Sequence, residues 1–283
     1  MNPDALLSPL YYLLGLLPFE IMQNQFMQRA VAGMLALTPL CALIGTLVVQ
    51  FRMAFFADAV SHSAFTGIAL GLLMGIDPWF GLLVFGVFAG MGAMRLRRTS
   101  DMSMDTTLGV IFSTLVALGL AIISAKKGLA KSLPMFLYGD ILSITDRDIL
   151  FTFGLLVLAL GFMAAYFNQL LTIGLHEDLA RVRGIPVDRL ELLFAALVSI
   201  VVGFSIRAVG ILLVTAFLII PSATARNLAH TVRGHVRLSV ILALLSAMGG
   251  LMLAIRLDIA AGAGMVLCSA GLFACTLPLR RSR

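Results

Sequence analysis

Residues 149–175 read I-L-F-T-F-G-L-L-V-L-A-L-G-F-M-A-A-Y-F-N-Q-L-L-T-I-G-L and contain no charged side chain. A helix needs about 20 apolar residues to cross the hydrocarbon core of a bilayer, so this stretch is long enough to span one. Lipid offers no hydrogen-bond partner to an exposed backbone, and a run of this kind can satisfy its own backbone there only as a helix. The stretch therefore predicts a membrane-spanning helix.

The same pattern recurs along the chain. Hydrophobic residues make up 60% of the sequence, charged residues make up 12%, and the mean hydropathy is +1.05. A soluble domain has roughly 45–50% apolar and about 25% charged residues, so this composition excludes an ordinary soluble protein. The other uncharged runs are 30–51, 59–76, 78–94, 106–125, 192–206, 208–225, 238–255 and 259–279.

These runs predict an all-α, polytopic membrane bundle with about nine transmembrane helices. Glycines at i+4 spacing on two of the runs, among them Gly67 and Gly71, indicate helices whose backbones approach closely. An eight-span arrangement, in which the two short spans within 189–221 are merged, is the alternative. The expected spans are 28–51, 57–75, 79–95, 105–124, 148–168, 189–206, 208–221, 237–256 and 259–278.

The N-terminus differs from the rest of the chain. Residues 1–27 are expected to form an extracytoplasmic or interfacial segment, and 28–283 the transmembrane domain. The stretch 5–17 is too short for a span and predicts an interfacial helix with Tyr11 and Tyr12 at headgroup level.

The basic residues indicate the orientation of the bundle, because cytoplasmic loops carry an excess of Lys and Arg. With nine spans, Arg52 and four clusters fall on one side, which predicts a cytoplasmic C-terminus and an extracytoplasmic N-terminus. Lys126, Lys127 and Lys131 fall on the other side and count against this. The loops also account for the net charge of +6, so nucleic acid is not an expected partner. The four clusters are Arg95, Arg97 and Arg98; Arg181, Arg183 and Arg189; Arg226, Arg233 and Arg237; and Arg280, Arg281 and Arg283.

Asp58 and His62 are the ionisable pair of greatest interest. They are one helical turn apart, so both side chains lie on one face of the second span. Ionisable groups at membrane depth usually mark a transport path or a buried pair, and a carboxylate with an imidazole suits zinc or manganese. A helix-capping Asp58 that simply bonds His62 is equally compatible with the spacing. Because zinc usually takes four ligands, the metal interpretation predicts a homodimer with the path on its two-fold axis.

Two further segments are candidates for contacts with partners. The charged stretch 175–189 lies between two apolar spans on the predicted cytoplasmic side, and it predicts a short helix over Glu177–Arg183 that ends before Gly184 and Pro186. Its pattern fits a solvated loop helix or a docking helix for a cytoplasmic partner. Asp140, in an outer loop, could meet a partner or cap the next element.

Several motifs are absent from the sequence. It contains no G-x-x-x-x-G-K-[ST] phosphate loop, so the chain is not expected to bind ATP in that way. It contains neither H-E-x-x-H nor G-x-S-x-G, so no intramembrane hydrolase motif is present.

Five stretches resemble the permease subunits of bacterial zinc and manganese ABC importers, and they occur in the order of that family across roughly 28–278. They are F-R-M-A-F-F-A-D-A-V-S-H-S-A-F-T-G-I-A-L-G from Phe51 to Gly71, D-T-T-L-G-V-I-F-S from Asp105 to Ser113, F-L-Y-G-D-I-L from Phe136 to Leu142, the segment from His176 to Val187, and A-V-G-I-L-L-V-T-A-F-L-I-I-P-S-A-T-A-R from Ala208 to Arg226.

The resemblance implies a type II importer-like permease in the bacterial inner membrane that moves a divalent metal ion by alternating access. The metal would be cargo, with no cofactor tightly bound, and ATP would be bound and hydrolysed by a separate cytoplasmic subunit, so the chain itself would not be an enzyme. Two copies would form the path, with Asp58 and His62 as transient ligands and Arg52 and Met53 near the cytoplasmic gate. An extracytoplasmic metal-binding protein would deliver the ion, with Asp140 on its side. The ATPase would dock on Glu177, Asp178, Leu179, Ala180, Arg181 and Gly184.

Zinc is expected over manganese or iron because the sequence looks closest to the zinc-uptake branch of that family. Three alternatives remain: a secondary metal transporter driven by an ion gradient, a permease for metal chelates or vitamin cofactors, and a membrane-embedded metal-dependent hydrolase. The first would usually show two similar halves with broken helices, which the sequence does not.

Overall fold

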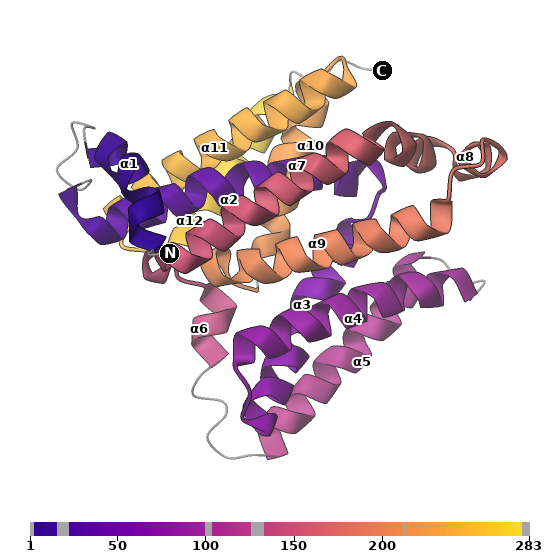
Figure 1. Ribbon diagram of the computed structural model, residues 1–283, viewed down its shortest axis with the longest axis horizontal. Coiled ribbons are helices and arrows are strands. Elements are labelled where there is room, and N and C mark those ends of the chain that lie inside the picture. The colour runs from indigo at the N-terminus through magenta and orange to yellow at the C-terminus, as the bar shows by residue number, and fades with distance from the viewer. Residues whose placement is uncertain (1–2, 16–22, 100–103, 126–132, 212, 279–283) are drawn as a thin grey trace.

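In the computed structural model, the residues described are 3–15, 23–99, 104–125, 133–211 and 213–278, and every regular element within them is helical (Figure 1). The expected all-α fold is therefore confirmed. The helices are α1 (Pro3–Gly15), α2 (Gln25–Gln50), α3 (Ala54–Met74), α4 (Pro78–Thr99), α5 (Met104–Ala125), α6 (Leu133–Tyr138), the 3-10 turn η3 (Ile141–Ser143), α7 (Asp146–Leu175), α8 (Glu177–Val182), α9 (Val187–Val209), α10 (Val214–Leu228), α11 (Val232–Leu257) and α12 (Ala261–Thr276).

Each of the nine expected spans overlaps one of these helices. In the described residues, seven helices are long and apolar enough to cross a membrane, namely α2, α3, α4, α5, α7, α9 and α11. The other two expected spans correspond to α10, with 15 residues, and α12, with 16. Two separate helices, α9 and α10, cover the region that the eight-span alternative merges into one span. Gly210 ends α9 with a φ of 87°.

The helix α2 forms the centre of the bundle. In its apolar stretch 89% of the residues are buried, whereas the figure is 17% for α5 and for α7. The helices α7, α10 and α11 pack around α2, and α3, α4 and α9 form a second group beside them (Figure 1). The outward faces of α5 and α7 are therefore left for lipid or for another chain.

The glycine spacing correctly predicts close packing of α3 on α4. A Cβ atom on Gly67 would lie 2.6 Å from the carbonyl oxygen of Gly81, and one on Gly81 would lie 2.5 Å from that of Gly67. The two backbones touch at this point. A Cβ atom on Gly71 would likewise meet the Cα atom of Pro78 at 3.1 Å. The helices α3 and α4 therefore form a tightly packed pair.

The N-terminal helix is fastened to the bundle by an acid at the start of α7. The Tyr11 hydroxyl donates to Asp146, and Arg29 donates from Nη2 to Asp146 Oδ2 at 2.5 Å. The pKa of Tyr11 is raised mainly by burial and secondly by its hydrogen bond to the Asp146 carboxylate. The hydroxyl therefore keeps its proton. Tyr12 is exposed, as expected for a residue at the interface, but Tyr11 points inward to Asp146. Residues 16–22, within the expected N-terminal segment, lie outside the described part.

Arg52 and the described members of the predicted basic clusters lie at one end of the bundle, which we call the basic end, whereas Arg29 and Arg207 pair with acids at the start of α7. A Cβ atom on Gly174, near the end of α7, would lie 3.5 Å from Gln50 at the end of α2. Arg226 Nη1 donates to the Val49 carbonyl at 3.4 Å, and the Asn227 amide lies 3.4 Å from the Thr276 hydroxyl. This brings the ends of α2, α7, α10 and α12 together, as the orientation argument requires. Two parts of that argument lie outside the described residues: Lys126, Lys127 and Lys131, and Arg280, Arg281 and Arg283.

Candidate metal path and coupling surface

The turn between α2 and α3 sets the position of the candidate metal ligands. Arg52 adopts a left-handed conformation with φ of 55°, which is uncommon for a residue with a Cβ atom. The amide of Met53 donates to the Val48 carbonyl at 2.9 Å, and the Met53 side chain is buried. The turn therefore reverses the chain sharply at the basic end and starts α3 one residue later. The expected gate residues form this turn.

Asp58 and His62 lie on one face of α3, as the spacing predicts. His62 Nδ1 is 3.6 Å from Asp58 Oδ1 and 3.0 Å from the Asp58 carbonyl oxygen. The Ser61 hydroxyl donates to the same carbonyl at 2.9 Å. In the described part of the chain these contacts of the imidazole all involve Nδ1, so Nε2 is the nitrogen that can face a ligand.

Two residues that the sequence argument did not single out complete the site. Thr215, at the start of α10, donates its hydroxyl to Asp58 Oδ1 at 3.0 Å. The ring of Phe112 on α5 meets the His62 imidazole edge to face, with centroids 5.1 Å apart. The hydroxyl orients the carboxylate and the ring orients the imidazole. Thr215 lies within the motif from Ala208 to Arg226. Its hydroxyl, in an apolar run at the start of a helix, is the sequence signal that could have identified it.

The pair is open on one side. The side chain of Asp58 is 42% exposed and that of His62 is 26% exposed, although both belong to a membrane-spanning helix. Among the described residues, no group of three or more His, Cys, Asp or Glu side chains could hold a metal ion. One chain therefore offers an oxygen and a nitrogen ligand on a partly open face, and further ligands would come from outside it.

The expected short helix between the two apolar spans is present as α8. It starts at Glu177, ends at Val182, and is followed by Gly184, which has a φ of 74°. The amide of Ile185 donates to the Ala180 carbonyl at 3.1 Å, so the glycine ends the helix by reversing the chain. Ala180 is fully buried and anchors α8, whereas Leu179 is 42% exposed and Val182 is 85% exposed. Val182, which the sequence argument did not select, thus presents an apolar side chain outward.

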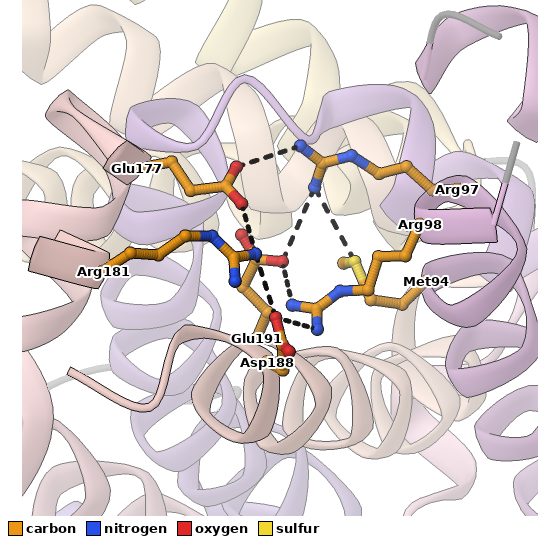
Figure 2. A network of polar contacts seen from close by, with 7 residues as sticks. All are labelled: Met94, Arg97, Arg98, Glu177, Arg181, Asp188 and Glu191. Atoms are coloured by element: carbon orange, nitrogen blue, oxygen red, sulfur yellow. Dashed lines mark hydrogen bonds and ion pairs between the residues drawn. The ribbon is translucent and has the colours of Figure 1, made fainter. Parts of the chain in front are cut away.

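A network of charges ties α8 to α4 and α9 (Figure 2). Arg181 Nη2 contacts Glu177 Oε1 at 2.9 Å and Asp188 Oδ1 at 3.0 Å. Arg98 on α4 contacts Asp188 and lies 2.7 Å from Glu191 Oε2. Arg97 lies 3.7 Å from the same Glu191 oxygen and 3.9 Å from Glu177 Oε2.

The network has a consequence for the docking segment. Glu191 is nearly buried, and Arg97 and Arg98 of α4 are the cations that contact its carboxylate. The sequence argument used Arg97 and Arg98 only as signals of topology. It could not find their acidic partners, because these are distant in the chain: Arg98 and Glu191 are 93 residues apart. The α8 segment is thus joined to α4, which packs directly on the helix that carries Asp58 and His62.

Asp140 caps the next element at the opposite end. Its side chain accepts from the Leu142 amide at 3.0 Å and begins η3. Gly139 adopts a φ of 64°, and a Cβ atom there would lie 2.3 Å from the Gly210 amide nitrogen. The F-L-Y-G-D segment therefore packs tightly on the α9–α10 break. Asp140 is exposed, and its contact with a binding protein stays a prediction.

A comparison with models of protein families identifies the family of this helical bundle. The model for the ABC 3 transport family matches residues 23–279. The chain belongs to the ABC 3 transport family. The match spans both the Asp58–His62 site and the α8 segment, and it confirms the resemblance drawn from the five motifs.

Several relatives within the ABC 3 transport family carry functional names. The membrane protein ZnuB of the high-affinity zinc uptake system of Haemophilus influenzae is 32% identical over 243 residues, which cover 86% of this chain and 93% of that protein. The manganese import system permease protein ScaB of Streptococcus gordonii is 30% identical over 262 residues, covering 93% and 92%. Zinc and manganese relatives are thus similarly close.

Solved structures agree with the fold of this ABC 3 family chain. The PsaBC structure from Streptococcus pneumoniae, in complex with Fab, matches with a TM-score of 0.78 at 29% identity, covering 93% of this chain and 92% of that chain. An inward-facing chain described as of the metal-chelate type of ABC transporter matches with a TM-score of 0.69 at 20% identity and supports the fold alone.

Proposed function

We propose that this chain is the permease subunit of an ATP-driven importer for a divalent metal ion, with zinc as the first candidate cargo. The observation that carries the proposal is the open pair of Asp58 and His62 on α3, held by Thr215 and Phe112. Ionisable residues in a membrane-spanning helix are costly, and here they offer the oxygen and nitrogen ligands that such ions take. Relatives named for zinc and for manganese support the same cargo class.

We propose that two copies place their Asp58 and His62 side chains around one path. Each chain contributes two ligands, so a two-fold pair supplies the four of a tetrahedral zinc site. The site can bind and release the ion because each ligand is only partly buried. A partly exposed carboxylate can exchange with water, which suits a transient site better than a permanent one.

The coupling to ATP would run through α8. Leu179 and Val182 present apolar side chains at the basic end, where a cytoplasmic ATP-binding subunit would dock. Movement of α8 would pull on α4 through Arg97 and Arg98, and α4 would carry α3 with it because their backbones touch at Gly67 and Gly81. We propose that this chain of contacts joins ATP-driven motion to the ion ligands. An extracytoplasmic metal-binding protein would deliver the ion to the opposite end, on the side of Asp140.

The test is metal uptake in vesicles that contain this chain, its ATPase and its binding protein. Zinc, manganese and iron are offered separately, with and without ATP, to the wild type, to Asp58→Ala and to His62→Ala. His230→Ala, an exposed histidine at the basic end, is the matched control. We expect ATP-dependent uptake of one metal that falls by at least about tenfold in both site variants, because each removes a ligand, and is unchanged in the control.

Two outcomes would contradict the proposal. Uptake without ATP would indicate a secondary transporter. ATP-dependent uptake that persists in both assembled site variants would keep the importer and reject Asp58 and His62 as its ion ligands.

A further inference from the structure

A groove of about 450 Å³ lies between α7, α11 and the C-terminal third of α2, toward the basic end. None of these helices carries Asp58, Thr215 or Phe112, so the groove is separate from the ion path. One end of its lining is polar, with two arginines and an amide, and the remainder is apolar. The lining residues are Leu43, Leu160, Met163, Ala164, Phe167, Asn168, Arg233, Val236 and Arg237.

The polar end of the groove carries uncompensated positive charge. Arg233 and Arg237 are one turn apart at the start of α11, so their side chains share a face. Both are exposed, and within the described residues neither guanidinium makes a hydrogen bond or an ion pair. The first turn of α11 contains no acid, and the groove lining includes none. Two guanidinium groups converging without a carboxylate favour a phosphate oxygen as the missing partner.

The apolar end of the groove lies within the membrane. Its apolar residues belong to α2, α7 and α11, which are all long and apolar enough to span a bilayer. From Asn168 back to Leu160 the groove follows α7 for eight residues, or roughly 12 Å at the helical rise. This length is most of one leaflet, since the hydrocarbon core is about 30 Å thick. The excess of basic residues in cytoplasmic loops explains the presence of the two arginines. The apolar groove beneath them requires an apolar occupant as well.

We propose that this groove binds a phospholipid with an anionic headgroup. Its phosphate would lie between Arg233 and Arg237 beside the Asn168 amide, and one acyl chain would lie along Leu160, Ala164 and Phe167. Basic pockets between transmembrane helices on the cytoplasmic side are suited to acidic headgroups. A soluble partner, such as an ATPase subunit, would reach the arginines but leave the apolar part of the groove empty.

The test measures lipid retained by the purified full-length chain. The protein is incubated with equal amounts of phosphatidylglycerol and phosphatidylcholine in detergent micelles, and the bound lipids are counted by native mass spectrometry. We expect the wild type to retain phosphatidylglycerol preferentially. The double variant Arg233→Gln/Arg237→Gln should reduce this preference by about tenfold or more, since each arginine near an anionic surface contributes substantially. Arg233→Lys/Arg237→Lys should keep most of it.

A second pair of variants tests the acyl chain. Ala164→Phe fills the groove, whereas Ala165→Phe places the same ring on the next, equally exposed position outside the lining. We expect Ala164→Phe to lose the bound lipid and Ala165→Phe to retain it. Arg256→Gln, at the other end of α11, is the charge control. Elution volume and thermal unfolding confirm that each variant is folded.

Three outcomes would overturn the proposal. Retention of phosphatidylglycerol in the double Gln variant would exclude the arginines. Loss in the double Gln variant but full retention in Ala164→Phe would indicate a site for phosphate alone. Cross-linking of Arg233 to the ATPase in the assembled complex, with no lipid present, would assign the arginines to that partner.

Discussion

The candidate ligand atoms of Asp58 and His62 are held in different ways. The carboxylate accepts the Thr215 hydroxyl from another helix, and the imidazole is bonded through Nδ1 to its own helix one turn back. The first contact depends on how α10 lies against α3, and the second moves with α3. A change in the relation of α3 to α10 would therefore alter the Asp58 environment more than that of His62.

Thr215→Val tests this dependence. Valine keeps the shape of the side chain and removes the hydroxyl, and a hydrogen bond to a charged group contributes about 1.5–3 kcal/mol, less where the group is half exposed. We expect the metal concentration for half-maximal uptake to rise by about three- to tenfold, with assembly intact. Thr152→Val is the control, because that hydroxyl donates to the Asp148 carbonyl on α7. An unchanged concentration dependence would mean that Thr215 does not position Asp58.

At the scale of the helix, the charges around Glu191 decide how firmly α8 is held. Glu191 is 4% exposed and relies on Arg97 and Arg98, while the Arg181–Glu177 pair is largely exposed. Truncating one partner of a buried pair leaves an unpaired charge, whereas exposed pairs contribute little. The contact between α4 and α9 therefore contributes most to stability, whereas the exposed contacts of Arg181 contribute little.

Arg98→Met is expected to lower the free energy of unfolding by about 2–4 kcal/mol, because Glu191 would keep only the more distant Arg97. Arg181→Met should lower the free energy of unfolding much less than Arg98→Met, because exposed ion pairs contribute little to stability. Thermal and denaturant unfolding in detergent measure both. The double variant Arg98→Met/Glu191→Leu should recover much of the loss, since no buried charge is then left unpaired. Equal losses in Arg98→Met and Arg181→Met would refute the assignment of the structural role to Glu191.

At the scale of the whole molecule, the two halves of the bundle present different outer surfaces. The site on α3, α5 and α10 is open and carries ionisable groups, while α7 faces outward with apolar residues such as Phe151 and Val157. A polar opening inside a membrane is stable only if it meets water, an ion or another protein. The proposed two-fold contact therefore belongs on the α3 side, and lipid on the α7 side.

Cysteine cross-linking locates that contact. In a background of Cys41→Ser, Cys268→Ser and Cys275→Ser, we expect His62→Cys to give a covalent dimer with a short bifunctional thiol reagent, because two-fold symmetry brings identical residues together near its axis. Val157→Cys, on α7, should remain monomeric. Gel mobility under denaturing conditions measures the result. Dimers through Val157→Cys alone would move the interface to α7 and reject the shared path.

The sequence by itself determined the class of the protein and the pairing of its two candidate ligands. Uncharged runs of span length dictate membrane helices, because lipid cannot satisfy an open backbone, and the i,i+4 spacing places Asp58 and His62 on one face without further information. The five motifs gave the family, which the family model confirms. The helical ending at Gly184 also followed from local rules of helix termination.

Only the tertiary structure decided which residues complete the site and what joins it to the docking segment. Thr215 lies 157 residues from Asp58, and Glu191 lies 93 residues from Arg98. No local pattern relates such positions, because their proximity arises from the packing of α10 on α3 and of α9 on α4. The same is true of the inward position of Tyr11 and of the groove in which α7 and α11 bring an apolar surface beneath two arginines. Local periodicity specifies a helix and its faces, and the packing of all helices together determines which faces meet.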